Sequence, residues 1–369
     1  MGIINESGRK VKMIGCVAEF NPFTEGHAEF VKKARLATGC EDGVFAAVMS
    51  GDFVQRGEPA IFDKFSRAAK AVRNGIDLVV ELPLPWSLSS AERFASGGVS
   101  ILERLGAEAI VFGSECGDVA ALAELKDKIA SREGIEAVKN YLKANPNASY
   151  PAARSAVMQS PLLDGPNNSL GIEYLKAATL PCFTVKRENS EHDGFHSAGE
   201  MRAEMKSLGL GVDYAALELA IVSRLRMFDR EYFNSLPDSA DGAGNRLYEA
   251  VRAENTLEGI YEAAKTKSLT MSAVRRLTMC AALGIKNGMN EGTPPYIRIL
   301  AFNTKGREAL KNCKSPYLIT QPKESASLGE DAQKVFAVGA LAHDLYLLGF
   351  RQKSAQNCGE DYRTGPFIV

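Results

Sequence analysis

The sequence predicts an α/β protein in which a parallel sheet with crossover helices is followed by a mainly helical C-terminal domain. Over the first two hundred residues, short apolar runs rich in β-branched residues alternate with longer segments of helical periodicity, which is the pattern of a parallel sheet. After about residue 205, segments such as YAALELAIVSRLRMF keep helical spacing with few strand candidates between them. We therefore expect two domains, residues 1–205 and 206–369.

The predicted strands recur at a spacing that suits β-α-β units. The segment IDLVVELPL is largely apolar, as expected of a strand covered on both faces. We expect strands at Val11–Phe20, Val44–Ser50, Asp77–Leu84, Ala109–Ser114 and Cys182–Arg187.

The helices predicted between these strands have apolar residues at helical spacing. They are expected at Gly26–Ala37, Asp63–Asn74, Ser89–Leu105, Val119–Ile129, Ile135–Leu142 and Asn168–Ala178.

Composition excludes several classes of function. The 369 residues carry 44 Lys and Arg against 45 Asp and Glu, so no global positive field attracts nucleic acid or an anionic membrane. Seven scattered cysteines and four histidines indicate reduced thiols and no metal cluster. Because there is neither a signal peptide nor an apolar run long enough to cross a bilayer, we expect a cytoplasmic protein without membrane contact. The sequence leaves the oligomeric state open.

The most informative segment is the first strand and the turn that follows it, KMIGCVAEFNPFTEGHAEFVKKAR. The strand ends at Phe20, and Thr24 to His27 begin a helix. Backbone N–H groups at a helix start lack intrahelical partners and lie at the positive end of the macrodipole, so the turn suits a polyphosphate. His27 and Thr24 can donate hydrogen bonds as negative charge builds up on departing pyrophosphate. The alternative is that His27 only caps the helix.

This T/H-x-G-H turn resembles the motif of the nucleotidyltransferase superfamily, whose Rossmann-like domain is shared with class I aminoacyl-tRNA synthetases. Further blocks in the same order, MSGDFVQRGEPAIFDKFSRA, GIDLVVELP, FGSE, PNNSLGIEYLKA and TVKR, are similar to the tRNA(Met) cytidine acetate ligases. The blocks extend from about residue 14 to 187, and the C-terminal half is compatible but less distinctive.

The resemblance implies a two-step reaction. Acetate and ATP give acetyl-adenylate and pyrophosphate, and the acetyl group is then transferred to N4 of the wobble cytidine of elongator tRNA(Met). Mg²⁺ is expected from polyphosphate chemistry alone, because no ligand set is visible in the sequence.

The resemblance also implies the site residues. His27 and Thr24 are expected to be catalytic. The ATP-binding residues are expected to be Val17, Ala18, Glu19, Phe20, Asn21, Pro22, Phe23, Thr24, Glu25, Gly26, His27, Ala28, Glu29, Phe30, Gly113, Asn168 and Arg187.

An interpretation that involves no ligand is also open for each of Gly113, Asn168 and Arg187. Gly113 lets adenosine lie against the backbone at a strand end, or is a turn glycine. Asn168, with Asn167 beside it, contacts ribose or base, or caps the following helix. Arg187 binds phosphate, or is a solvated arginine at a strand end.

Two departures from the family pattern affect the phosphate site. The family often has histidine where this chain has Thr24. The turn expected to touch the phosphates reads His196 to Arg202 here, and Glu200 places a negative charge within it. Ser197 and Arg202 can still be aligned with the family turn.

Two further segments are candidates for substrate contact. The loop MSGDFVQRGEP carries Asp52, Gln55, Arg56 and Glu58 and is expected to line the acetate or cytidine side, although a solvated loop is the alternative. For tRNA, the strongest local basic cluster is in KTKSLTMSAVRRLTM. We expect phosphate contacts from Lys265, Lys267, Arg275 and Arg276, against the alternative of a solvated helix face.

Two other functions share these features. An adenylyltransferase acting on a small phosphate monoester would use the same turn but should need only one small domain. A non-catalytic RNA-binding protein with a decayed nucleotide site is supported only by the altered turn at Ser197 to Arg202.

Overall fold

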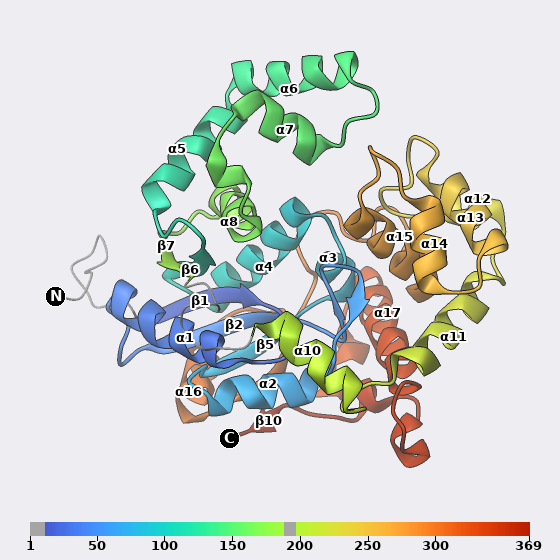
Figure 1. Ribbon diagram of the computed structural model, residues 1–369. Helices are drawn as coiled ribbons and strands as arrows, with labels where there is room; N and C mark the ends of the chain where they lie inside the picture. Colours follow the sequence, from blue (N-terminus) through green and yellow to red (C-terminus); the bar gives the residue numbers. More distant parts are fainter. Residues whose placement is uncertain (1–11, 188–196) are drawn as a thin grey trace.

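The computed structural model describes residues 12–187 and 197–369. It is built around one eight-stranded sheet, with helices on both faces (Figure 1). The strand order is β10-β8-β5-β2-β1-β6-β7, with β9 paired to β8. The strands are β1 (Met13–Ala18), β2 (Val44–Ser50), β5 (Leu78–Leu82), β6 (Ala109–Ser114), β7 (Cys182–Lys186), β8 (Ile297–Phe302), β9 (Leu318–Ile319) and β10 (Phe367–Ile368).

The predicted parallel sheet is confirmed for its five N-terminal strands. The pairs β1·β2, β2·β5, β1·β6 and β6·β7 are all parallel, so the carboxyl ends of these strands meet at one edge. The chain builds β1, β2 and β5 on one side and then crosses to β6 and β7 on the other. The order therefore reverses between β1 and β6, and crevices at such a switch point bind ligands in open α/β sheets.

Residues alternate between two cores because side chains of a strand point to opposite faces. Ala46 and Val48 of β2 face one core, while Ala47 and Met49 face the other. The first core lies under α4 (Ala91–Leu105), α5 (Val119–Ala130) and α8 (Pro166–Ala177). The second lies under α1 (Glu25–Thr38) and α2 (Lys64–Arg73).

The remaining elements of the N-terminal half are short or extend away from the sheet. A small hairpin of β3 (Phe53–Val54) and β4 (Glu58–Pro59) follows β2, and α6 (Arg132–Ala144) and α7 (Tyr150–Met158) form an arm at the top of Figure 1. The others are α3 (Leu84–Ser87) and η1 (Pro161–Leu163).

The C-terminal half has a helical core of its own. Its buried residues come mainly from α11 (Tyr214–Leu225), α13 (Ala243–Ala253), α14 (Leu257–Ala264), α15 (Met271–Leu283) and α17 (Glu330–Leu347). Phe53 of the hairpin and Leu84 and Leu88 also belong to this core, so the N-terminal half contributes to it. The other C-terminal elements are α10 (Ala198–Ser207), α12 (Arg230–Asn234), α16 (Thr304–Asn312), η2 (Pro322–Ser327), η3 (Lys353–Gln356) and η4 (Glu360–Tyr362).

Three strands of the C-terminal half were not predicted. β8 joins the sheet antiparallel to β5, and β9 and β10 pair with β8. A division at residue 205 therefore separates β8 to β10 from the sheet to which they belong, although most of residues 206–369 are helical as expected.

Other differences lie at the ends of elements. β1 begins at Met13, whereas the predicted strand began at Val11, which lies outside the described residues. β1 also ends at Ala18, before the predicted end at Phe20, because Phe20 has a φ of 45°, in the left-handed region that a strand cannot include.

Candidate nucleotide-binding site

The turn between β1 and α1 lies at the switch point of the sheet. Phe20 has a φ of 45°, which is uncommon for a residue with a side chain and occurs most often where surrounding contacts impose it. The side chain of Asn21 fixes the turn, because its Oδ1 accepts a hydrogen bond from the Ile61 amide at 2.9 Å. The side chains of Phe20 and Phe23 are buried and pack against His27. The turn therefore presents the start of α1 in a fixed orientation.

Thr24 and His27 form a reciprocal cap at the start of α1. The Thr24 amide donates to Nδ1 of His27 at 3.0 Å, and the His27 amide donates to Oγ1 of Thr24 at 3.3 Å. The capping role that we weighed as an alternative is therefore real. A backbone N–H can only donate, so Nδ1 of His27 must accept, and the proton of the neutral ring lies on Nε2. The cap thus leaves the Nε2–H of His27 as the donor for a ligand.

His27 stays neutral over the physiological range. Burial of the ring, together with the positive charge of Arg187, lowers the pKa of His27 to about 4. A neutral imidazole with its proton on Nε2 can donate one hydrogen bond without first losing a proton. A donor of this kind can stabilise charge that develops on a departing phosphate oxygen.

Gly113 and Arg187 lie together on the other side of the switch point. A Cβ placed on Gly113 would lie 3.1 Å from Cγ of Arg187, so the absence of a side chain gives the arginine stem its path along the backbone. Arg187 is exposed and donates to Oδ1 of Asn167 at 3.3 Å. The predicted residues Gly113, Arg187 and His27 therefore occupy one region.

Asn168, which was predicted to contact ATP, is hydrogen-bonded to backbone amides of the protein. It is buried, and its Oδ1 accepts hydrogen bonds from the amides of Glu115 and Cys116. Glu115 in turn accepts from the Asn167 and Asn168 amides at the start of α8, and although burial acts in the opposite direction, these hydrogen bonds lower the pKa of Glu115. Asn168 shapes the loop after β6, and its contact with ATP stays a prediction.

Arginines surround the carboxyl end of β1. Arg67 of α2 donates to the carbonyl of Glu19 and to those of Ser50 and Gly51, which places a cation beneath the ends of β1 and β2. Arg202 of α10 donates to the carbonyl of Asn21 at 2.6 Å. Burial raises the pKa of Glu19, even though Gln55, Arg56, Arg67 and Arg202 favour its charged form.

The altered phosphate turn is partly described by the structure. Of its residues, His196 lies outside the described residues, whereas Ser197 caps α10 and the Glu200 carboxylate accepts the Ser197 amide at 2.7 Å. Glu200 therefore acts as the partner of a capping box at the start of α10. Two residues further, Arg202 donates to the Asn21 carbonyl in the β1–α1 turn, and its contact with phosphate stays a prediction.

The outer residues of the predicted ATP site have other contacts. Glu29 pairs with Lys32 and Lys33 on the surface of α1, and the ring of Phe30 packs at 6.3 Å from that of Phe45. Val17 packs close to Gly98 of α4, which has no side chain to obstruct it. A role in ATP binding for these three residues stays a prediction.

The loop after β2 forms the β3–β4 hairpin and touches both halves of the molecule. The Gln55 amide donates to Oε1 of Glu19 at 2.9 Å. At the hairpin turn, Gly57 lies against the backbone of Arg275 and Arg276 in α15, and Glu58 pairs with Arg275. The hairpin thus connects the candidate nucleotide site with the C-terminal helices.

The predicted basic cluster does not form one surface. Lys265 and Lys267 are exposed in the loop between α14 and α15. Arg275 is paired with Glu58 and Glu258, and Arg276 is half-buried with its pKa lowered by burial. The difference follows from position in the chain, because the two lysines lie in the loop before α15, whereas the two arginines lie within α15, against which the β3–β4 hairpin packs.

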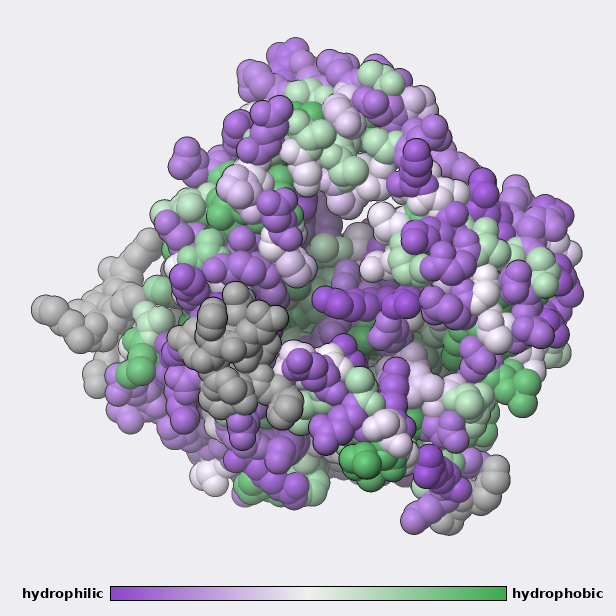
Figure 2. Space-filling model, in the orientation of Figure 1, coloured by the Kyte–Doolittle hydropathy of each residue, from purple (hydrophilic) through white to green (hydrophobic). Residues whose placement is uncertain are grey.

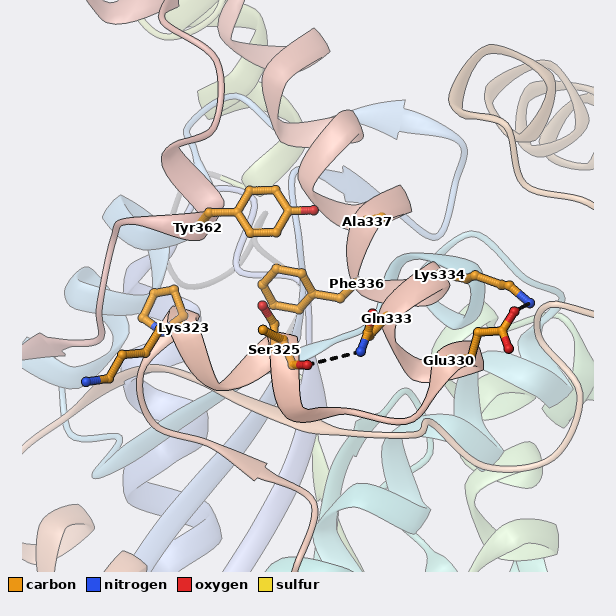
Figure 3. A pocket seen from close by; sticks show the side chains of 10 residues that line it. Lys323, Ser325, Glu330, Gln333, Lys334, Phe336, Ala337 and Tyr362 are labelled. Carbon is orange, nitrogen blue, oxygen red and sulfur yellow. Dashed lines mark hydrogen bonds and ion pairs between the residues drawn. The ribbon is translucent and has the colours of Figure 1, made fainter.

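The described residues also form hollows away from this turn. One, of about 680 Å³, is lined by residues of η2, α17 and η4 and has Phe336 and Tyr362 on its walls (Figure 3). The other, of about 440 Å³, lies between the α6–α7 connection and Lys267. Figure 2 also shows the molecule hollowed near its centre, between the α6–α7 arm and the C-terminal helices.

Residues 12–187 and 197–369 contain no group of three or more His, Cys, Asp or Glu side chains that could hold a metal ion. In the same residues, no helix is long and apolar enough to cross a membrane.

Comparisons with known proteins agree with this geometry. The profile of the HIGH Nucleotidyl Transferase family matches residues 11–213 and 196–361. The tRNA(Met) cytidine acetate ligase of Caldicellulosiruptor saccharolyticus is 33% identical over 82% of this chain and 85% of its own length. That of Clostridium acetobutylicum is 33% identical over 89% of this chain and 96% of its own length.

A solved structure shares the fold over nearly the whole chain. The crystal structure of Thermotoga maritima TmcAL bound with alpha-thio ATP superposes with a TM-score of 0.86 and 25% sequence identity. The similarity covers 97% of this chain and 99% of the other.

Proposed function

Because the chain belongs to the tRNA(Met) cytidine acetate ligase family of HIGH nucleotidyltransferases, we propose that it acetylates tRNA(Met) by way of acetyl-adenylate. A carboxylate oxygen of acetate attacks the α-phosphorus of ATP, and the bond to the bridging oxygen of pyrophosphate breaks. The N4 amine of the wobble cytidine then attacks the acetyl carbonyl. AMP leaves, and the amine loses a proton.

The observation that carries the proposal is the β1–α1 turn, where Thr24 fixes the tautomer of His27 at the switch point of the sheet. With Nδ1 occupied, the Nε2–H of His27 is the donor that we assign to the departing pyrophosphate. The start of α1 adds backbone N–H groups and the positive end of a helix dipole.

We assign charge neutralisation to Arg187 and Arg202, which approach the turn from β7 and α10. Arg202 reaches the Asn21 carbonyl, and Arg187 is close enough to lower the pKa of His27. Two guanidinium groups near the turn suit a polyphosphate, because each can bind phosphate oxygens in a bidentate manner.

Mg²⁺ fits this site only as an ion that arrives with ATP. The described residues offer no carboxylate cluster that could hold it, so its ligands would come mainly from phosphate oxygens and water. When bound, Mg²⁺ would neutralise phosphate charge.

For tRNA, we propose that Lys265 and Lys267 contact the phosphate backbone while Arg275 and Arg276 hold the C-terminal helices and the hairpin. The basis is exposure, since the two lysines are exposed and the two arginines are half-buried. Within residues 206–369, the tRNA-contacting part is the helical part, because β8 to β10 belong to the sheet. A cytoplasmic location follows from these proposed substrates.

The proposal is tested by acetate-dependent exchange of labelled pyrophosphate into ATP. We expect exchange that requires acetate, and N4-acetylcytidine in tRNA(Met) after incubation with ATP and acetate, measured by nucleoside mass spectrometry. Exchange that needs a phosphate monoester in place of acetate would identify a different adenylyltransferase. A folded protein with no exchange under any of these conditions would contradict the proposal.

A further inference from the structure

A network of buried charges joins the loop after β2 to the last segments of the chain. Nζ of Lys64 lies 2.9 Å from Glu81 and 2.7 Å from Asp361, and Nη1 of Arg298 lies 2.9 Å from the same Asp361 oxygen. These four side chains are all at most 8% exposed. They come from α2, β5, β8 and η4, so the network connects segments that are far apart in the sequence.

His343 of α17 extends this network to Asp52. Its Nδ1 lies 2.7 Å from Oδ2 of Asp52, and its Nε2 lies 3.1 Å from Glu360. Asp52 and Glu360 raise the pKa of His343 to about 10, although burial and the nearby Lys64 act in the opposite direction. The imidazole is therefore charged and donates to a carboxylate at each nitrogen.

Asp52 is the residue through which the network reaches the nucleotide site. Its Oδ1 accepts the amide of Lys64 at 2.8 Å, and its carbonyl accepts the amide of Ala60 at 2.8 Å. These bonds close the base of the hairpin loop. Three residues further on, the Gln55 amide holds Glu19 beside the turn that carries His27.

Stability alone is a weak reason for such a network. Buried ion pairs lose so much hydration that replacing them with apolar residues is often neutral or stabilising. A fixed geometry at the loop is a stronger reason, because a displacement of about 1 Å at a reacting centre can cost about 10²-fold in rate.

We propose that three residues position the site for adenylate formation: His343, and Glu360 and Asp361 of the C-terminal turn. They hold Asp52, and through it the hairpin loop and its contact with Glu19. None of them touches the nucleotide. The inference rests on the proposed function, because its readout is the adenylation reaction.

The test compares His343→Leu with His343→Asn in the full-length protein. Asn can place a donor near the position of Nδ1, whereas Leu cannot. We expect His343→Leu to reduce kcat/KM for ATP in acetate-dependent exchange by about 10- to 100-fold, and His343→Asn to recover most of the loss. Equal activity of the folded Leu variant and the wild type, or no recovery by Asn, would overturn the proposal.

Hydrogen exchange separates positioning from general destabilisation. In His343→Leu, the amides of β1 and α15 should exchange faster only by the factor that the loss of global stability gives, whereas those of residues 51–60 should gain more than this factor. The same increase throughout the protein would contradict a positioning role. If His343→Leu does not fold, Glu360→Gln replaces it, since the Glu360 side chain is 41% exposed. For this variant, kcat/KM in pyrophosphate exchange and the hydrogen exchange of residues 51–60 are measured in the same way. We expect kcat/KM to fall by about 3-fold, and an unchanged kcat/KM would overturn the proposal.

Asp77→Asn is the matched control. Asp77 is also buried and paired with an arginine, Arg35, at 2.6 Å, but it lies at the opposite end of the strands, before β5. This variant should lower Tm and leave kcat/KM unchanged. If the wild type shows no acetate-dependent exchange, the proposed function fails first; if the wild type is active, the variants test the positioning role alone.

Discussion

His27 and His343 show how one residue type acquires opposite properties in two regions of the same molecule. At a helix start, burial and then the charge of Arg187 lower the pKa of His27 to about 4. Burial acts in the same direction on His343, but the carboxylates of Asp52 and Glu360 outweigh it and raise the pKa of His343 to about 10. Both rings are desolvated, and the sign of the neighbouring charge decides the outcome.

This difference in charge suits the two histidines to different roles, His27 to contact with a ligand and His343 to holding the structure around it. A neutral imidazole whose Nε2–H is not used by the cap can serve a ligand, whereas a charged imidazole with both nitrogens bonded to carboxylates cannot. The first has to be accessible at Nε2. The second has its contacts fixed on every side, from α2, α17 and the C-terminal turn. The following predictions test this contrast.

The largest expected effect is the loss of stability in His343→Leu. Removal of the imidazolium leaves the buried carboxylate of Asp52 without one of its cations, and breaking a buried pair in this way typically costs about 3–5 kcal/mol. Urea unfolding at pH 7 measures the change in the free energy of unfolding. A cost below about 1 kcal/mol would put this pair in the class of exposed salt bridges.

His27→Ala should show the reverse pattern, a large loss of rate with little loss of stability. Loss of one electrostatic donor typically costs about 10² to 10³ in rate. The free energy of unfolding should change by less than about 1 kcal/mol, the usual size of a capping contribution. Pyrophosphate exchange and urea unfolding of the same preparation give both values. Undiminished exchange would remove His27 from the mechanism.

The two histidines should also give opposite pH dependence of stability. The raised pKa of His343 means that its contribution is fully present below pH 6.5 and is lost as the pH rises from 6.5 to about 10. The depressed pKa of His27 means that its contribution is present above pH 6.5 and is lost as the pH falls from 6.5 to about 4.

The free energy of unfolding is measured from pH 4 to 10 in the wild type and in the variants His27→Ala and His343→Asn. Subtracting each variant from the wild type gives the slope against pH that each histidine contributes. The His343 variant should differ in slope only in the upper window, and the His27 variant only in the lower one. Slopes that are parallel to the wild type in both windows would contradict the assigned charge states.

The smallest expected effect concerns Thr24. Thr24→Val removes the side-chain cap of α1 and should cost about 1 kcal/mol, whereas Thr24→Ser keeps the hydroxyl and should cost much less. Because the Thr24 amide still donates to His27, NMR of the ring nitrogens should find the proton on Nε2 in both variants. A shift of the proton to Nδ1 would show that the hydroxyl, rather than the amide, sets the tautomer.

Much of the fold could be predicted because its signals are local. Val44–Ser50 and Ala109–Ser114 are continuous apolar runs, and the structure has strands with these same limits. The turn from Phe20 to His27 was also recognisable, since a strand end, a capping residue and a glycine follow one another within a few residues. Gly113 and Arg187 were implied by the family resemblance alone, and the structure places them near this turn.

What the sequence did not reveal depends on contacts between distant residues. β10 has only two residues, too few for any periodicity to appear. The ion pair between Lys64 and Asp361 spans 297 residues, and nothing near either residue marks the other as its partner. Arg275 was expected to contact tRNA phosphates, with a solvated helix face as the alternative, but the hairpin that carries Glu58 lies against it. The charge of a side chain can be read from a sequence, whereas the partner that neutralises it is seen only in the tertiary structure.

The late position of Asp361 has a consequence for synthesis on the ribosome. When Lys64 and Glu81 leave the exit tunnel, Arg298, His343 and Asp361 have not yet been made, so the interior of the early sheet holds charges that still need water. We expect a stalled nascent chain ending at residue 205 to be sensitive to protease around α2, and one in which a linker carries residue 361 out of the tunnel to be resistant. The emergence of Asp361 would then mark the moment at which the proposed nucleotide site becomes competent.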